Sequence, residues 1–356
     1  MTAPLRAPFP WFGGKRGAAA LIWEAFGAVP NYVEPFAGSL AVLLARRSEP
    51  GTETVNDLDG LLVNAWRSMQ LSPDAMADAA SWPVSEADLH ARHLALVAWK
   101  ADRNLELLMA DPAWHDPVMA GWWAWGQSCW IGSGWCRGTG GWTVGADGRI
   151  TKAKSGGVSR QRPHLGDDGQ GVNHAGCRAA GVEFEHEYHT MTMPELRRWF
   201  SFLSARLRHV RILNGDWKRA LTGGASKTLP VRMGGHCGVF LDPPYADTAS
   251  RAGDLYAHDC EQVAHAVREW ALAHGDDPQY RIVLAGYDGE HQMPDGWREV
   301  EWYRAGFLKG GMANTSKVEG EDGETQQGRE RLWMSPHCLR PITHARQGDL
   351  FGAVAS

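Results

Sequence analysis

The chain has 356 residues, of which 44% are hydrophobic and 10% aromatic, and its formal net charge is −5 at pH 7. This composition is typical of a globular protein of one or two domains and excludes a disordered chain. The sequence contains no run of about 18 apolar residues and no apolar signal core in residues 1–6, so we expect a cytoplasmic protein without a membrane span. The six cysteines include no Cys-x-x-Cys pair, so we expect reduced thiols and no metal site.

A glycine pair followed by a lysine occurs near the N-terminus, in the stretch Trp11-Phe-Gly-Gly-Lys15. Glycines let the backbone approach a ligand closely, and the lysine places a positive charge beside it. A plain turn explains the same residues, so this stretch taken alone predicts no function. A helix over about 17–26 is expected to follow.

The segment 32–47 has the pattern of a strand, a glycine turn at Gly38 and a helix from Leu40 with Ser39 as its N-cap. A strand that runs into such a turn is the nucleotide-binding corner of a doubly wound sheet. Glu34 would repel a phosphate at this corner, whereas it would attract a cation. The segment therefore favours a positively charged adenosyl ligand over a dinucleotide.

A second strand ends at Asn56-Asp57, roughly 20 residues after Gly38, the spacing expected of an acid that binds ribose hydroxyls. The alternative is that Asp57 merely caps the helix that begins near Asp59. After this helix, residues 70–235 form a connection too long for an ordinary strand-to-strand crossover. We therefore expect an insertion, which starts with a helix over about 85–109.

The insertion is rich in tryptophan and contains two basic stretches. Six tryptophans between 122 and 142 form either a separate core or stacking platforms for bases beside Arg137. The stretch 149–164 contains five basic residues and no acid, within a glycine-rich segment, 145–181, that we expect to be a loop. The stretch 196–220, expected to hold a helix over 194–207 and a strand over 210–213, is also basic. Such stretches suit contact with phosphates, although a helix face that is merely exposed to solvent explains each stretch equally well.

The strand 239–241 ends at Asp242-Pro243-Pro244-Tyr245. Neither proline has an N–H for a parallel ladder, so the strand must stop in a stiff turn at its carboxyl end, where ligands of open α/β sheets bind. The Asp242 carboxylate and a proline carbonyl can hold a planar amine while the Tyr245 ring stacks on its base. Farther on, we expect a helix over 258–274, a strand over 281–285 and an antiparallel pair formed by 302–307 and 331–334.

These motifs, taken in order, resemble those of the Dam-type DNA adenine-N6 methyltransferases of the alpha group, which depend on S-adenosylmethionine. The resemblance implies an α/β fold with a doubly wound, mostly parallel, Rossmann-like sheet and an inserted, largely helical and loop DNA-recognition domain. It assigns residues 1–69 and 236–340 to the catalytic core, with 209–217 contributing a strand. The inserted target-recognition region is then 70–208, and 341–356 is a tail.

The resemblance implies methyl transfer from S-adenosylmethionine to N6 of adenine in double-stranded DNA, at a specific site, after the base has been flipped out. The catalytic residues would be Asp242, Pro243, Pro244 and Tyr245. The cofactor would contact Trp11, Lys15, Glu34, Phe36, Gly38, Asp57, Asp216, Trp217 and Asp242. DNA would contact Lys15, Arg137, Lys152, Lys154, Arg160 and Arg162.

One residue departs from the family pattern: Leu40 stands where many relatives have glycine, and its side chain can crowd the methionine end of the cofactor. The alternatives are a cytosine-N4 DNA methyltransferase, a protein-glutamine or RNA methyltransferase, and a DNA-binding relative that has lost catalysis. The motif order and Asp242 argue against the first, and the long basic insertion argues against the second. We expect a monomer, with a restriction endonuclease as the protein partner that the resemblance suggests.

Overall fold

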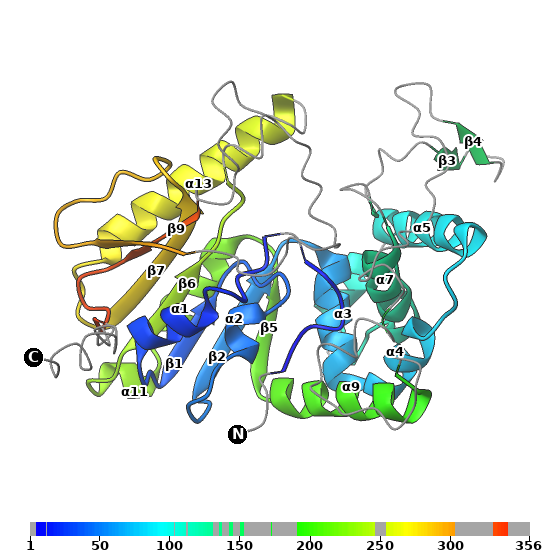
Figure 1. Ribbon diagram of the computed structural model, residues 1–356, viewed down its shortest axis with the longest axis horizontal. Coiled ribbons are helices and arrows are strands. Elements are labelled where there is room, and N and C mark those ends of the chain that lie inside the picture. Colours follow the sequence, from blue (N-terminus) through cyan, green and yellow to red (C-terminus); the bar gives the residue numbers. More distant parts are fainter. Residues whose placement is uncertain are drawn as a thin grey trace, which may run out of the picture.

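The computed structural model describes residues 5–11, 13–102, 104–111, 113–130, 135–136, 142–144, 150–152, 172, 191–245, 254–302 and 330–340. A seven-stranded sheet in the order β5-β2-β1-β6-β7-β9-β8 forms its centre (Figure 1). The strands are β1 (Asn31–Glu34), β2 (Thr52–Asp57), β5 (Val210–Asn214), β6 (Cys237–Leu241), β7 (Tyr280–Tyr287), β8 (Arg298–Glu301) and β9 (Glu330–Met334). The pairs from β5 to β7 are parallel, and β9 pairs antiparallel with both β7 and β8. The doubly wound, mostly parallel sheet predicted from the sequence is therefore confirmed.

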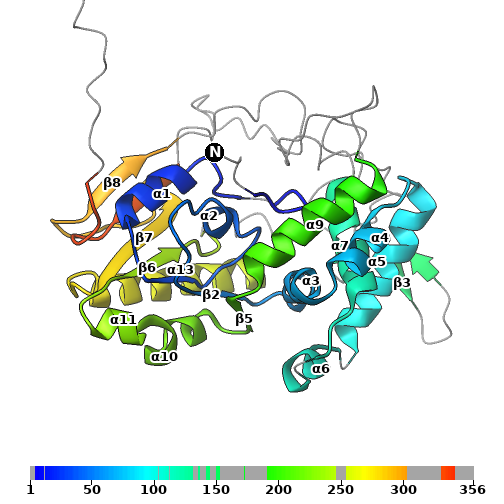
Figure 2. The ribbon, with the colours of Figure 1, turned by 90° about the horizontal axis from the view of Figure 1, so that it is seen from below.

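Successive side chains of a strand point to opposite sides of the sheet, and helices cover the central strands on both sides. Tyr32 and Phe240 pack in one core with α1 (Ala19–Phe26) and α2 (Ala41–Leu44). Their neighbours Val33 and Val239 pack in the other core with α13 (Asp254–His274), η1 (Trp217–Leu221) and α11 (Leu229–Arg232). Figure 2 shows α1 and α2 on one side of the sheet, and α13, α11 and α10 (Gly223–Ser226) on the other.

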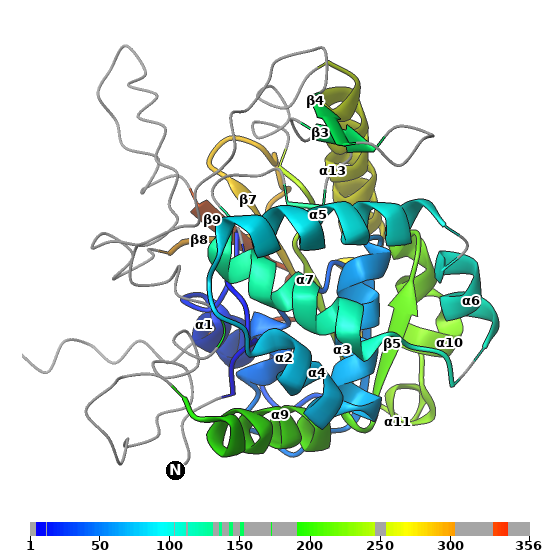
Figure 3. The same ribbon diagram turned by 90° about the vertical axis from the view of Figure 1, so that its right-hand side faces the viewer.

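The insertion forms a helical layer beyond the β5 end of the sheet (Figures 1 and 3). It contains α4 (Pro73–Ala80), α5 (Glu86–Ala101), α6 (Asn104–Ala110), α7 (Pro117–Cys129) and α9 (Met193–Leu207). Helix α3 (Gly60–Leu71) joins this layer to the sheet, because it packs against α7 and α9 as well as against β5. A short antiparallel hairpin, β3 (Trp142–Val144) and β4 (Ile150–Lys152), also belongs to the insertion.

Most of the described tryptophans in the Trp-rich segment are core residues. Trp123, Trp125, Trp130 and Trp135 are buried, and all four belong to the hydrophobic core that continues from the sheet into the helical layer. Gly126 makes this packing possible, since a Cβ at this position would lie 1.8 Å from the Trp135 ring. For these four residues, the core interpretation is confirmed.

Three local predictions are wrong. The single helix expected over 85–109 is two helices, α5 and α6. Ser39 does not cap α2, because the residue before this helix is Leu40 and no side chain caps it. The strand that pairs with 331–334 is β8 (Arg298–Glu301), and of the expected strand 302–307 only Trp302 lies within the described residues; alternate burial on β8 leaves little apolar pattern to detect. Among the described residues, no helix is long and apolar enough to cross a membrane.

Candidate active site at the carboxyl edge of the sheet

The predicted site residues meet at one edge of the sheet because neighbouring parallel strands end there together. Strand β1 pairs with β2 on one side and with β6 on the other, so Glu34, Asp57 and the turn after Leu241 lie at the same edge. Asp216 follows β5 at this edge, because Asn214 pairs with Asp57. The topology thus gathers residues that lie far apart in the sequence.

Asp57 joins the end of β2 to the glycine turn after β1. Its Oδ2 atom accepts a hydrogen bond from the Gly38 amide at 3.0 Å, and its Oδ1 atom accepts one from the Asp59 amide at 2.9 Å. The N-cap of α3 is Asp59, which accepts from the Leu61 amide at 3.0 Å. The interpretation of Asp57 as the cap of this helix is therefore wrong. Burial raises the pKa of Asp57 to about 6 although both amides favour its ionised form.

The glycine turn has no room for a side chain at Gly38. Its φ is +45°, in the left-handed region, and a Cβ there would lie 2.5 Å from Nε1 of Trp11. Leu40 is also left-handed, with φ 54° and ψ 28°, which costs a non-glycine residue about 1–2 kcal/mol. Its side chain is fully buried in the hydrophobic core. The expectation that Leu40 crowds a ligand is therefore not supported, because the side chain turns into the core.

The turn after β6 places a carboxylate, a lysine and a tyrosine in contact. Asp242 Oδ1 accepts hydrogen bonds from Lys15 Nζ at 2.9 Å and from the Tyr245 hydroxyl at 3.2 Å. The Tyr245 ring is 7% exposed and meets the edge of Tyr287 with ring centroids 4.6 Å apart. Burial, reinforced by the charge of Asp242, raises the pKa of Tyr245 well above its usual value. The hydroxyl of Tyr245 is thus a donor to the candidate catalytic acid.

Lys15 points into the site rather than toward solvent. It is 3% exposed, and its Nζ donates to the Gly13 carbonyl at 2.7 Å and lies 3.7 Å from Glu330 Oε2. Direct contact between this ammonium group and a DNA phosphate, expected from the sequence, does not fit this position. Sequence reasoning missed Glu330, because nothing in its neighbourhood along the chain marks a site. It reaches Lys15 only through the pairing of Glu330 with Tyr287 across β7 and β9.

Glu34 is a buried acid at the same edge. It is 3% exposed, and its Oε2 atom accepts a hydrogen bond from the Tyr32 hydroxyl at 2.9 Å. Burial raises the pKa of Glu34 to about 8, and the negative charge of Asp242 adds to this shift. Within the described residues Glu34 has no salt-bridge partner, so a ligand cation would meet an uncompensated acid here.

An aromatic pair borders the site on the β5 side. The rings of Phe36 and Trp217 stack at 28° with centroids 6.1 Å apart, and Leu58, next to Asp57, is 79% exposed. Asp216 is exposed and its carboxylate caps η1 by accepting from the Lys218 amide at 2.9 Å. The accessible apolar surface here therefore belongs to Phe36 and Leu58, because Trp217 is buried, while Asp216 has a structural bond of its own.

The predicted DNA contacts in the first basic stretch lie mostly beyond the described part of the chain. Arg137, Lys154, Arg160 and Arg162 are outside the described residues, and of Lys152 only the backbone, in β4, is described. In the second stretch, Arg206 is bound to Glu53 and Arg219 to the Asn214 carbonyl. These two arginines are therefore held within the protein rather than free to contact phosphates.

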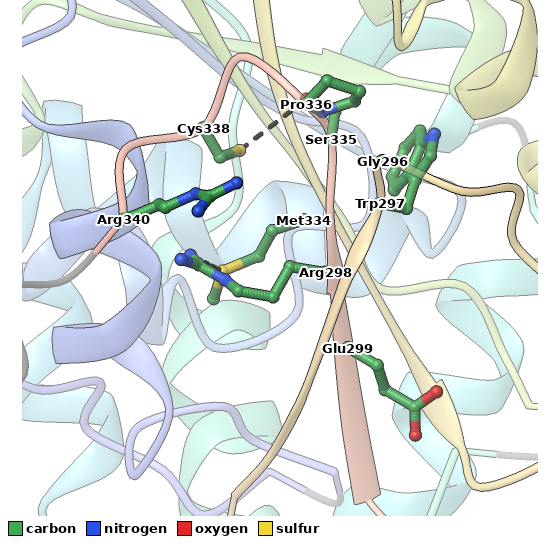
Figure 4. Close-up of a pocket in the computed structure, with 9 residues that line it drawn as sticks. All are labelled: Gly296, Trp297, Arg298, Glu299, Met334, Ser335, Pro336, Cys338 and Arg340. Atoms are coloured by element: carbon green, nitrogen blue, oxygen red, sulfur yellow. Dashed lines mark hydrogen bonds between the residues drawn. The ribbon is translucent and has the colours of Figure 1, made fainter.

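A cavity of about 540 Å³ lies elsewhere, around β8 and the end of β9 (Figure 4). Arg298 and Met334 line it, and Met334 pairs with Val283 while Glu330 pairs with Tyr287. The cavity is thus at the other end of β9 from the acids described above, and none of the predicted site residues lines it. No group of His, Cys, Asp and Glu in the described residues is arranged to hold a metal ion.

Comparison with known proteins supports the resemblance seen in the sequence. Residues 11–88 match the family model of D12 class N6 adenine-specific DNA methyltransferases. A search of the curated proteins gave no match. The matched segment contains the glycine turn and both Glu34 and Asp57, and the fold brings the Asp242 turn beside it on β6. The match supports an adenine-N6 DNA methyltransferase, and it covers residues 11–88 of the 356-residue chain.

Proposed function

We propose that this enzyme transfers the methyl group of S-adenosylmethionine directly to N6 of an adenine flipped out of double-stranded DNA at a specific site. The observation that carries the proposal is the position of Asp242. This acceptor for an amine lies at the same sheet edge as Glu34 and the Gly38–Asp57 turn. An amine acceptor and the residues that suit a cationic adenosyl group therefore lie at one edge of the sheet.

The residues at this edge fit the cofactor. Asp57 is partly exposed and can accept hydrogen bonds from ribose hydroxyls, and Phe36, which stacks on the buried Trp217, is the partly exposed ring available to the adenine. Glu34 lies at the same edge of the sheet, and it has no salt-bridge partner among the described residues. S-adenosylmethionine supplies an electrophilic methyl group on a positively charged sulfur. Trp11 and Gly38 complete the pocket by their close packing.

The catalytic turn acts on the target amine. Asp242 and the carbonyl of Pro243 accept the two amino hydrogens, which localises the nitrogen lone pair and stabilises the positive charge that develops during transfer. Extrusion of the base costs a few kcal/mol, and stacking on Tyr245 returns about 1–3 kcal/mol of it. Direct transfer requires no covalent intermediate, and the described cysteines Cys129, Cys136, Cys237 and Cys338 are all buried.

DNA recognition is assigned in this proposal to the insertion, 70–208, and catalysis to 1–69 and 236–340 with 209–217. The first basic stretch lies in the insertion and has no acid. Replacing Lys152, Lys154, Arg160 and Arg162 with Ala is expected to weaken DNA binding without changing cofactor affinity. The salt dependence of log K, measured by titration at several salt concentrations, should become shallower by about 0.9 for each phosphate that the protein no longer neutralises. An unchanged slope would assign recognition to other parts of the insertion.

The test is to incubate unmethylated DNA with the enzyme and cofactor labelled in its methyl group, and then to digest the DNA to nucleosides. Label in N6-methyladenosine is expected, with Asp242→Ala as the inactive control. Label in N4-methylcytidine would instead support the cytosine enzyme. Absence of label, together with cofactor binding in calorimetry, would indicate a DNA-binding relative without catalysis.

A further inference from the structure

The ammonium group of Lys15 occupies the place that the target amine needs. It donates to Asp242 Oδ1 at 2.9 Å and lies over the Tyr245 ring, 4.9 Å from the ring centroid. The proposed function gives the same two partners to the adenine, since its amino group binds Asp242 and its ring stacks on Tyr245. Lysine and target base therefore compete for one carboxylate and one aromatic face, and both cannot be bound together.

A retained lysine would also oppose the chemistry. The amine nitrogen becomes positively charged during methyl transfer. An ammonium group that shares the Asp242 carboxylate with it would repel this charge. Lys15 is buried, so it cannot simply move into water without displacing the residues that cover it. The lysine consequently needs a second anion close to its present position.

Glu330 meets this requirement. Its Oε2 atom is 3.7 Å from Lys15 Nζ, so a displacement of about 1 Å would bring the pair to charge-assisted hydrogen-bond distance. Strand β9 fixes Glu330 opposite Tyr287, whose ring packs against Tyr245. The second anion is thus held by the sheet, beside the aromatic face that the base requires.

We propose that Lys15 is an internal substitute for the target amine, and that Glu330 receives its ammonium group when the adenine enters. Glu330 is then a positioning residue, which keeps Lys15 away from Asp242 and compensates its charge during transfer. This inference rests on the proposed function. It adds that the site without a target base is neutralised by Lys15, and that base entry is coupled to a switch of one salt bridge.

The experiment measures DNA affinity with a non-reactive cofactor analogue, for duplexes with adenine or an abasic residue at the target position found by mapping methylated sites. The ratio of the two affinities reports how well the adenine competes for its pocket. Glu330→Gln should lower this ratio by about ten-fold, the loss expected from one charged hydrogen bond, because Lys15 then stays on Asp242. Lys15→Met should raise the ratio, and Glu330→Gln should have no further effect in the Lys15→Met protein.

Glu301→Gln is the matched control, because Glu301 lies on the neighbouring strand and faces Arg331 at 3.7 Å. It should leave the ratio and the single-turnover rate unchanged, whereas Glu330→Gln should slow single turnover. An unchanged ratio in Glu330→Gln, or the same loss with and without Lys15, would overturn the switch. If Glu330→Gln does not fold, Glu330→Asp can be used instead. Its side chain is one methylene shorter, so the carboxylate lies farther from Lys15 and the ratio should also fall. A wild-type enzyme that methylates no DNA adenine would refute the proposed function itself.

Discussion

Two buried glutamates on neighbouring strands of the sheet have opposite surroundings. Glu53, near the amino end of β2, is 2% exposed and is bound by Arg46 at 3.1 Å and by Arg206 at 2.6 Å. Glu34, at the carboxyl end of β1, is almost equally buried, but its side chain is bonded to the neutral hydroxyl of Tyr32. Burial alone therefore does not distinguish a structural acid from a candidate ligand-binding acid.

The charge around each acid makes the distinction. Arg206 comes from α9, so Glu53 uses its charge to attach the last helix of the insertion to the sheet. Glu34 has no salt-bridge partner among the described residues, and burial raises its pKa to about 8, with the charge of Asp242 adding to the shift. A buried acid that the fold leaves without a cation is a good candidate for binding a cationic ligand. The amino edge of the sheet thus holds an acid that is paired with arginines, and the carboxyl edge holds the candidate site.

The sharpest test of this division is Asp242→Ala. Loss of the carboxylate should lower methyl transfer at least about 10²-fold, the usual cost of removing one electrostatic stabiliser, while the protein stays folded. Asp277→Ala is the matched control, because Asp277 lies before β7 at the opposite edge and pairs with Lys227. Equal activity of the two variants in the labelled-methyl assay would place the chemistry elsewhere.

The contribution of the Glu53 ion pairs to stability is tested by Arg206→Met. Removing Arg206 leaves the buried Glu53 with Arg46 as its remaining described ion-pair partner, so the free energy of unfolding should fall by up to about 3–5 kcal/mol, the cost of breaking a buried pair. Arg197→Met is the control, because Arg197 pairs with Asp78 at 2.8 Å on exposed surface, where a salt bridge contributes at most about 1 kcal/mol. Urea denaturation measures both, and equal losses would contradict the role given to Glu53.

The sequence predicted the parts of the site that depend on local backbone rules. Two prolines must end a strand at Asp242, and glycine must occupy the turn at residue 38, so these features are visible in the sequence. Leu40 shows the limit of such rules. Ser39 has the propensity of an N-cap, but the turn that begins at Gly38 puts Leu40 into a left-handed conformation, and its buried side chain offsets the strain.

Contacts that depend on strand pairing could not be predicted. Glu330 approaches Lys15 because β9 runs antiparallel beside β7. In the sequence, Glu330 comes 315 positions after Lys15. One partner of Glu53 is also remote, since Arg206 belongs to a helix more than 150 residues away, whereas Arg46 is a neighbour along the chain. Edge strand β8 was misplaced because half of its side chains face solvent, which removes the apolar pattern of a buried strand.

The raised pKa of Glu34 predicts that cofactor binding depends on pH. With a pKa of about 8, Glu34 is mostly protonated at neutral pH, so its stabilising contribution is present at low pH and is lost as the pH rises through 8. A cationic cofactor favours the ionised form, so its affinity should rise with pH by up to about ten-fold per unit below pH 8 and then level off. Calorimetry between pH 7 and 9 measures this, above the range in which Asp57 titrates.

Glu34→Gln is the variant that isolates this effect. It cannot ionise, so its cofactor affinity should be weaker at pH 9 and nearly constant over the same range. A wild-type affinity that does not change between pH 7 and 9 would show that the cofactor cation does not require the ionised acid. The contrast between Glu34 and Glu53 would then reflect local packing alone.

The smallest expected effect concerns the hydroxyl of Tyr245. The ring is the part required for stacking, so Tyr245→Ala should lose most activity, while Tyr245→Phe keeps the stacking surface. The hydroxyl nevertheless donates to Asp242 at 3.2 Å, so Tyr245→Phe removes one hydrogen bond that orients the carboxylate. The cost should be about 0.5–1.5 kcal/mol, or roughly 2- to 10-fold in the rate of single-turnover methyl transfer. A loss in Tyr245→Phe as large as that in Tyr245→Ala would mean that the hydroxyl, rather than the ring, makes the essential contact, and that Asp242 acts only when the tyrosine holds it.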